Sequence, residues 1–148
     1  MEKIWLKSYA PNVPPGLSYN GLSMPELLTK TAATFPARPA VSFLGARLNF
    51  RQLEAQVNRM ANALMHLGVQ PGDKVALLLP NMPQISVAVY AIWRIGAVVV
   101  MNNPLYTDTE LEHQLKDSEA GFLICLDLLA PRMIALKPRT HVQKIIVA

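Results

Sequence analysis

The chain has 148 residues and a mass of 16.3 kDa, the size of one ordinary domain. Apolar residues make up 51% and charged residues 16%, a balance that excludes an intrinsically disordered tail. A single cysteine excludes a disulfide scaffold and leaves one thiolate for a metal. The net charge of +4 is scattered along the chain with no basic run of three residues, so we expect no nucleic-acid partner.

The N-terminal sequence, MEKIWLKSYAPNVP, lacks the apolar core of a signal peptide. Together with the lone Cys125, this favours a cytoplasmic protein. The longest apolar run, from Ile85 to Met101, is interrupted by Arg94 and Gly96 and falls short of the roughly 20 residues of a membrane span. We therefore expect no transmembrane segment and interpret the run as a buried helix, a turn and a buried strand.

The chain divides into an irregular segment, residues 1–22, and an α/β subdomain, residues 23–148. The first segment is rich in Pro, Gly and aromatic residues. Ser23-Met24-Pro25-Glu26 then matches a capping box with Pro in the first turn, which predicts a helix that ends near Phe35, before Pro36.

A hairpin and a second helix are expected next. Two short segments, Ala40–Leu44 and Arg47–Asn49, flank a turn at Gly45-Ala46. Asn49 then caps a helix, with Gln52 three residues on and Gly68 at its end.

From residue 71 onward, apolar segments alternate with helical ones. The expected strands are Lys74–Leu79, Ala97–Met101, Ala120–Leu126 and Lys144–Val147, and the expected helices are Gln84–Ile95, Glu110–Asp117 and Leu129–Lys137. This βαβαβαβ order, preceded by a helix–β-hairpin–helix, predicts an α/β fold with a mostly parallel sheet and helices on both faces. Because no helix follows the last strand, we interpret the chain as a fragment.

We expect no complete catalytic, cofactor-binding or metal site in these residues. Neither G-x-G-x-x-G nor G-x-x-x-x-G-K-[ST] occurs, and the turns after the first two expected strands, residues 80–83 and 101–104, contain Pro, which removes a backbone donor.

His113 is the histidine with two candidate partners on its own helix. Glu110-x-x-His113 is half of a di-metal motif, but the sequence has no second copy. His113-x-x-x-Asp117 resembles the His–Asp motif of one acyltransferase class, although Ser118 stands where a glycine normally follows. We expect a surface pair, with catalysis as the alternative.

The remaining candidates have structural interpretations. His66 is expected in the last turn of its helix, where a cation is favoured, and His141 in a linker. Cys125 is expected to be a buried, inert thiol. Arg94 either caps the end of its helix or lines a polar cleft. Five methionines are expected at core positions: Met60, Met65, Met82, Met101 and Met133.

A set of motifs then points to one family. The segments are Leu48–Glu54 (LNFRQLE), Pro71–Asn81 (PGDKVALLLPN), Gly96–Val100 (GAVVV), Asn103–Thr107 (NPLYT) and Glu110–Ser118 (ELEHQLKDS). Together they resemble the N-terminal region of AMP-forming acyl-CoA synthetases, in particular bacterial long-chain fatty acid–CoA ligases, over nearly all of the chain. Two departures stand out: Met101-Asn102 replaces an expected Asn-Val, and Glu119 stands where Gly is usual.

The resemblance implies the first subdomain of a larger AMP-binding domain and a two-step reaction by the full-length protein. A fatty acid and ATP would give an acyl-adenylate and pyrophosphate, and coenzyme A would then displace AMP. ATP, Mg²⁺ and coenzyme A are implied for that parent and not for this fragment, because the family's phosphate loop, Mg²⁺-binding acid and catalytic lysine lie downstream. The expected partners are the remainder of the synthetase chain and the fatty acid. Peripheral association with the inner membrane is a further expectation.

Three hypotheses remain open, and two of them belong to classes other than the synthetase fragment. The chain is either a fragment that is inactive alone or a stand-alone α/β binding or scaffold module that self-associates into a homo-oligomer through its apolar surface. The third hypothesis is an acyltransferase built on His113 and Asp117.

Overall fold

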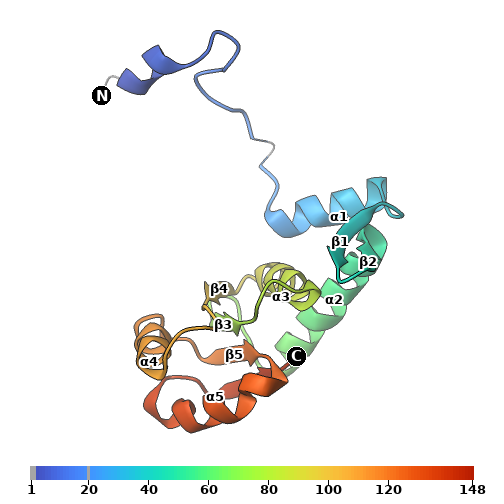
Figure 1. Cartoon of the computed structure of the whole chain (residues 1–148). Coiled ribbons are helices and arrows are strands. Elements are labelled where there is room, and N and C mark those ends of the chain that lie inside the picture. The colour runs from blue at the N-terminus through green and yellow to red at the C-terminus, as the bar shows by residue number, and fades with distance from the viewer. Residues whose placement is uncertain (1–2, 20) are drawn as a thin grey trace.

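The computed structural model describes residues 3–19 and 21–148, and Figure 1 separates an N-terminal arm from the body of the molecule. Residues 3–19 lead away from the body and contain one short 3-10 helix, η1 (Ile4–Ser8), with no buried side chain in the arm. The segment expected to be irregular thus has one helical turn, and its residues 1, 2 and 20 lie outside the described ranges.

The body begins with two helices that enclose a hairpin. The elements are α1 (Met24–Thr34), β1 (Pro39–Phe43), β2 (Ala46–Asn49) and α2 (Phe50–His66). Ser23 and Asn49 cap the two helices with complete capping boxes, as the sequence predicts. The hairpin turn lies one residue earlier than predicted, at Leu44-Gly45. Both of these residues have positive φ (47° and 83°), as the tight turns that suit hairpin twist require.

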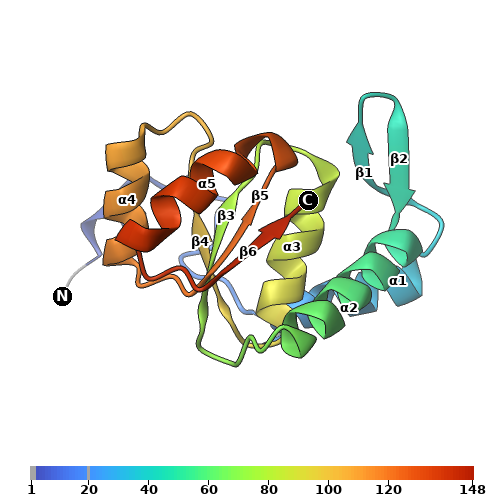
Figure 2. The same cartoon turned by 90° about the horizontal axis from the view of Figure 1, so that it is seen from below.

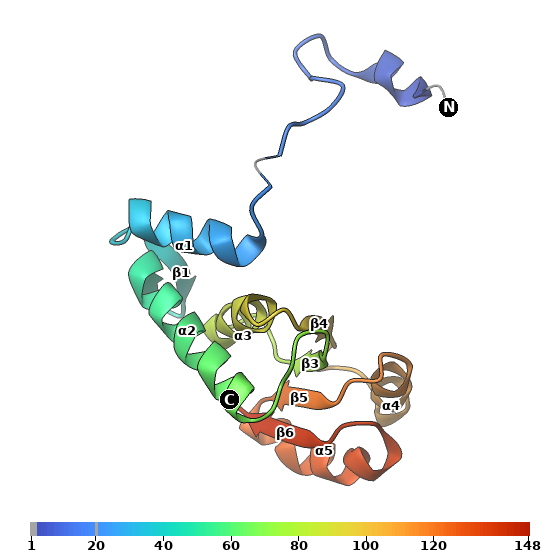
Figure 3. The same ribbon diagram turned by 180° about the vertical axis from the view of Figure 1, so that it is seen from behind.

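Four parallel strands form the main sheet, in the order β4-β3-β5-β6. The strands are β3 (Lys74–Leu78), β4 (Val98–Met101), β5 (Phe122–Cys125) and β6 (Lys144–Val147), and they alternate with α3 (Pro83–Arg94), α4 (Asp108–Asp117) and α5 (Ala130–Leu136), with η2 (Asp127–Leu129) and η3 (Lys137–Arg139) beside α5. Figures 2 and 3 show helices on both faces of this sheet. The predicted α/β fold with a parallel sheet is therefore confirmed.

Side-chain alternation along β3 divides the core into two layers. Val75 and Leu77 belong to the layer formed with α1, α2 and α3, whereas Ala76 and Leu78 face α4 and α5. The central strands β3 and β5 are buried on both faces, and the edge strands β4 and β6 are exposed at their ends. Continuous apolar runs are what a sheet covered on both faces requires.

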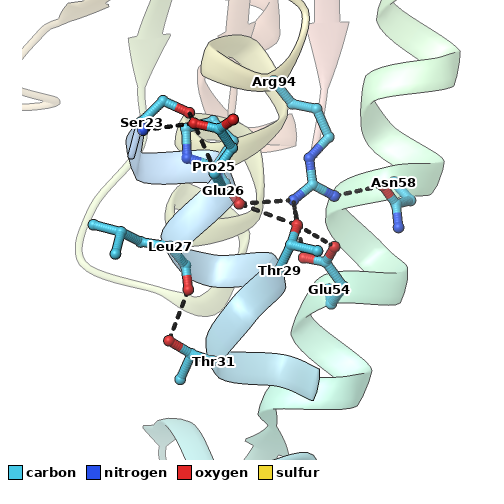
Figure 4. A network of polar contacts seen from close by, with 9 residues as sticks. All are labelled: Ser23, Pro25, Glu26, Leu27, Thr29, Thr31, Glu54, Asn58 and Arg94. Atoms are coloured by element: carbon cyan, nitrogen blue, oxygen red, sulfur yellow. Dashed lines mark hydrogen bonds and ion pairs between the residues drawn. The ribbon is translucent and has the colours of Figure 1, made fainter. Parts of the chain in front are cut away.

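One ion-pair network joins the first three helices, and Arg94, in the last turn of α3, is its centre (Figure 4). Its Nη2 donates to Glu54 Oε2 of α2 at 2.9 Å and to Thr29 Oγ1 of α1 at 3.1 Å. The same nitrogen lies 3.3 Å from the carbonyl oxygen of Pro25, and Nη1 donates to Asn58 Oδ1. The guanidinium is therefore shared among three helices.

This arrangement corrects the sequence interpretation of Arg94. The side chain does not cap its own helix; it donates to a carbonyl of α1 and pairs with a carboxylate of α2. Only 18% of each side chain of the Arg94–Glu54 pair is exposed, so the pair is largely shielded from water. Sequence reasoning could not find Glu54, because it lies 40 residues before its partner.

We predict that Arg94→Met lowers the free energy of unfolding by about 2 kcal/mol, because the carboxylate of Glu54 loses a charge-assisted partner in a shielded site. Chemical denaturation followed by circular dichroism measures the loss. Arg139→Met is the matched control, since Arg139 pairs with Glu112 on the surface and should change little. Equal effects of the two substitutions would contradict the assigned role of the network.

A second local feature is the turn after α4, where Glu119 has a φ of +53°. The backbone N–H of Glu119 donates to the carbonyl oxygen of Lys116, and the N–H of Ala120 donates to the carbonyl oxygen of Leu115. Helices that end with this pair of hydrogen bonds usually have glycine at the position of Glu119. The carboxylate accepts a hydrogen bond from Lys74 Nζ at 2.8 Å, which lowers the pKa of Glu119. The departure from glycine thus combines backbone strain with an ion pair to β3.

We predict that Glu119→Gly raises the denaturation midpoint more at pH 3 than at pH 7. A lowered pKa means that the ion pair stabilises the fold above the ordinary carboxyl pKa and is lost as the pH falls. Relief of the positive φ is independent of pH, so the variant gains the same relief at both values and loses the pair only at pH 7. Leu44→Gly, at φ +47° and without a charge, is the control and should show no pH dependence. A gain for Glu119→Gly that is equal at both pH values would contradict this account.

Candidate functional site at the carboxyl edge of the sheet

The chain reverses its direction of winding between β3 and β5. From β3 it passes through α3 on one face to β4, and from β5 it passes through α5 on the other face to β6. Ligands of open α/β sheets bind outside the carboxyl ends of the strands at such a point. The loops that follow β3, β4 and β5 are therefore the place to look for chemistry.

An arginine fixes the loop between β4 and α4. Arg132 of α5 donates from Nε to Asp108 Oδ1 and from Nη2 to the carbonyl oxygen of Tyr106, each at 2.6 Å. Within the loop, Asn103 Oδ1 accepts from the backbone N–H of Leu105 at 3.0 Å. These contacts hold the loop in one shape against α5.

The same edge is apolar at its surface. Leu105 in the loop after β4 is 88% exposed, and Leu128 in the turn after β5 is 82% exposed. Parallel strands place both residues at one edge of the sheet. Two large aliphatic side chains in water at the ligand-binding edge of an α/β sheet indicate a surface that another element covers.

A hollow of about 200 Å³ opens beside this edge, on the face of α2 and α3. It is smaller than the cavities of about 300–1,000 Å³ that hold most small ligands. Its apolar lining includes Met60, Leu79, Val87, Ile124, Ile146 and Val147. The hollow suits an aliphatic group and offers no charged side chain for a phosphate.

Asn102, directly after β4, is the buried polar residue of this edge. Only 4% of it is exposed, and its Nδ2 donates to the carbonyl oxygen of Val100 at 3.0 Å. Its Oδ1 has no hydrogen-bond partner in the part of the chain that the structure describes. The family pattern predicts Asn at position 101 and Val at position 102. In this chain the order is reversed: Met101 is 52% exposed, and the amide of Asn102 occupies the buried position.

The His113 candidates are not brought together as a site. His113 and Asp117 are both exposed on α4, and no hydrogen bond or ion pair joins them in the described ranges. Glu110 is occupied in the capping box: its Oε2 accepts from the N–H of Thr107 at 2.7 Å and from the hydroxyl at 2.8 Å, and these bonds lower the pKa of Glu110. The carboxylate of the half-motif therefore points to the start of its helix.

The other candidates are dispersed. His66 and His141 are exposed, at the end of α2 and in the linker before β6. Cys125 is buried at the end of β5, and burial raises the pKa of its thiol. The methionine prediction is wrong for Met65 and Met101, which are about half exposed, whereas Met133 lies in the core.

A nucleotide does not fit the residues present. Across residues 3–19 and 21–148, no group of three His, Cys, Asp or Glu side chains could hold a metal ion. The turn after β3 contains Pro80 and Pro83, which lack the N–H groups that hold phosphates. The carboxyl edge provides an apolar surface and a loop that is fixed by Arg132.

Comparison with known proteins assigns this fold to a family. The family model for "AMP-binding enzyme" matches residues 28–148. The chain belongs to the AMP-binding enzyme family. A long-chain-fatty-acid–CoA ligase of Bacillus subtilis is 38% identical over 146 residues, which is 99% of this chain and 26% of that protein. The chain therefore spans about a quarter of the length of that relative and corresponds to an N-terminal portion of it.

Solved structures of fatty acid–CoA ligases resemble this chain as well. A long-chain-fatty-acid-CoA ligase of Archaeoglobus fulgidus superposes with a TM-score of 0.83 at 28% identity, covering 90% of this chain and 29% of that one. The inhibitor-bound N-terminal domain of FACL13 from Mycobacterium tuberculosis gives 0.78 at 30% identity, covering 84% of this chain and 33% of that one. No helix in the described ranges is both long and apolar enough to cross a membrane.

We predict that Asn102→Val stabilises the chain by about 1–2 kcal/mol, because the removal of a buried acceptor without a partner outweighs the loss of the hydrogen bond from Nδ2 to the carbonyl oxygen of Val100. The midpoint of urea unfolding measures the gain. Asn103→Val is the matched control: Asn103 is exposed and its Oδ1 already accepts the N–H of Leu105, so its loss should destabilise the loop slightly. A lower midpoint for Asn102→Val would contradict the assignment of Asn102 Oδ1 as an unsatisfied acceptor.

Proposed function

We propose that this chain is the first subdomain of an ATP-dependent long-chain fatty acid–CoA ligase and is inactive alone. The supporting observation is that curated long-chain-fatty-acid–CoA ligases match 99% of the chain at 35–38% identity. In the full-length enzyme, the fatty acid carboxylate attacks the α-phosphate of ATP and pyrophosphate leaves. The thiol of coenzyme A then attacks the acyl carbonyl, and AMP leaves as the thioester forms.

The part played by this chain is structural support of the cleft. Residues 23–148 form the subdomain and residues 1–22 precede it as a separate segment. ATP, Mg²⁺ and coenzyme A are held by the remainder of the synthetase chain, which is the main partner of this one. Leu105, Leu128 and the apolar hollow at the carboxyl edge are surfaces that this remainder covers.

The setting that fits this function is the cytoplasm, with peripheral association of the full-length enzyme with the inner membrane. Fatty acids partition into lipid, whereas ATP and coenzyme A are water-soluble. An enzyme that joins them works where the two phases meet.

A second candidate function is a self-associating binding or scaffold module. The observation that favours it is the exposed apolar surface of the carboxyl edge, together with the hollow beside it. Light scattering distinguishes the two, because a discrete oligomer of defined mass that does not bind the dye ANS would favour the self-associating module. Aggregates that bind the dye would favour the fragment.

The ligase proposal predicts no fatty-acid-dependent exchange of pyrophosphate into ATP by the 148-residue chain. The longer chain that contains it should exchange pyrophosphate with long-chain fatty acids, which is the positive control. Turnover by the 148-residue chain would overturn the proposal that it is inactive alone. Failure of the longer chain with every long-chain fatty acid would overturn the substrate class. His113→Ala in the longer chain should leave the rate unchanged, and a loss of activity would support the acyltransferase hypothesis instead.

A further inference from the structure

Two apolar hollows meet at the seam between α2 and α3. The first is the hollow of about 200 Å³ described above, beside β5 and β6. The second, of about 330 Å³, lies where the β1–β2 hairpin stands beside the start of α3 (Figure 2). Gln56 of α2 and Gln84 of α3 line both hollows, which therefore form one groove, here called the α2–α3 groove. Its joint volume lies within the range of about 300–1,000 Å³ that holds most small ligands.

The polar side chains of the α2–α3 groove lie at its hairpin end and at its middle. Arg47 of β2 is the only charged side chain among the described residues that line it, and the end beside β6 is aliphatic. Within the described ranges, the Arg47 side chain makes no hydrogen bond or ion pair, and the amides of Gln56 and Gln84 make no hydrogen bond. A guanidinium forms paired, charge-assisted hydrogen bonds with a carboxylate. The groove therefore has a place for an anionic head group at one end and for an apolar tail at the other.

The aliphatic end of the groove is too narrow for a folded segment of protein. One turn of an α-helix rises about 5.4 Å and is about 10 Å across, so it occupies roughly twice the volume of this hollow. An added strand needs the backbone N–H and C=O groups of a sheet edge, whereas side chains of α2 and α3 line the groove. An unbranched aliphatic chain has no polar groups that burial would leave unsatisfied. A ligand with a single aliphatic tail fits this end of the groove.

We propose that the α2–α3 groove binds one free fatty acid, with its tail beside Met60 and Val87 and its carboxylate at Arg47. A phospholipid carries two acyl chains, and the narrow hollow suits one. This site goes beyond the proposed ligase activity: a nucleotide does not fit the residues present, so the bound acid is not the reacting one. The remainder of the ligase chain closes the groove over the acid and does not fill it. The proposal rests on the ligase assignment only for the presence of long-chain fatty acids around the protein.

The first test measures binding to the 148-residue chain. The probe is cis-parinaric acid, a long-chain fatty acid whose fluorescence rises when it leaves water, used below its critical micelle concentration. It should bind saturably, with one molecule per chain, and palmitate should displace it. Hexadecanol has the tail without the carboxylate, and butyrate has the carboxylate without the tail, so both should displace the probe much less well.

The second test locates the carboxylate. Arg47→Gln should weaken the binding of palmitate about tenfold, because a hydrogen bond to a charged group is lost. Arg51→Gln is the matched control, since Arg51 is also exposed but lies in the first turn of α2 and does not line the groove. Neither side chain belongs to the core, so both variants should keep the unfolding midpoint. Equal weakening by the two substitutions would overturn the proposal.

The third test locates the tail. Met60→Trp should fill the narrow hollow and shift the preference of the groove from palmitate to octanoate. Met65→Trp is the matched control, because Met65 lies on the same helix, is about half exposed and does not line the groove. Circular dichroism shows whether Met60→Trp is folded, and the pair of arginine variants tests the proposal in either case.

The absence of saturable binding would overturn the proposal, as would displacement by hexadecanol that equals displacement by palmitate. In the longer ligase chain, the groove should bind one fatty acid in addition to the one that reacts. Loss of groove binding in that chain would indicate that the remainder fills the groove, which contradicts the proposal. Pyrophosphate exchange without groove binding rejects this inference alone, and groove binding without exchange rejects the ligase assignment alone.

Discussion

Burial of β3 and β5 on both faces is the constraint on which the rest of the molecule depends. Their side chains alternate between two layers, so each layer must be closed by helices that the chain supplies before and after the strands. α2 and α3 close one layer, and α4 and α5 close the other (Figure 2). The reversal of winding that results places three loops at one edge of the sheet, where ligands of open α/β folds generally bind.

A shielded guanidinium completes the first of these layers. Without Arg94, α1 would keep its apolar contacts with α2 and α3 and the hydrogen bond from the Thr29 hydroxyl to Glu54 Oε1 at 2.9 Å, and apolar contacts fix burial better than they fix orientation. The bonds to Glu54 and to the Pro25 carbonyl have preferred directions, so they set how α1 lies across the other two helices (Figure 4).

The carboxyl edge combines a fixed loop with an exposed apolar surface. Arg132 holds the loop after β4, and the side chains of Leu105 and Leu128 are exposed. The reversed pair Met101 and Asn102 places an unsatisfied amide oxygen under this surface, which sets this chain apart from the pattern expected of its relatives. The chain matches about a quarter of the length of its fatty acid–CoA ligase relatives.

The sequence by itself determined the elements that rest on local physics. Local patterns predicted the α/β class and most helix boundaries. These patterns are the capping boxes, the turn residues and the apolar periodicity of α2, β3 and β5, and each involves residues only a few positions apart. Only the tertiary structure decided that β4, as apolar as β5 in sequence, is an edge strand with Val98 and Met101 exposed. The tertiary structure likewise decided the partners of Arg94 and the burial of Asn102. Each depends on which distant segments of the chain pack together, and the spacing of residues in the sequence does not indicate this.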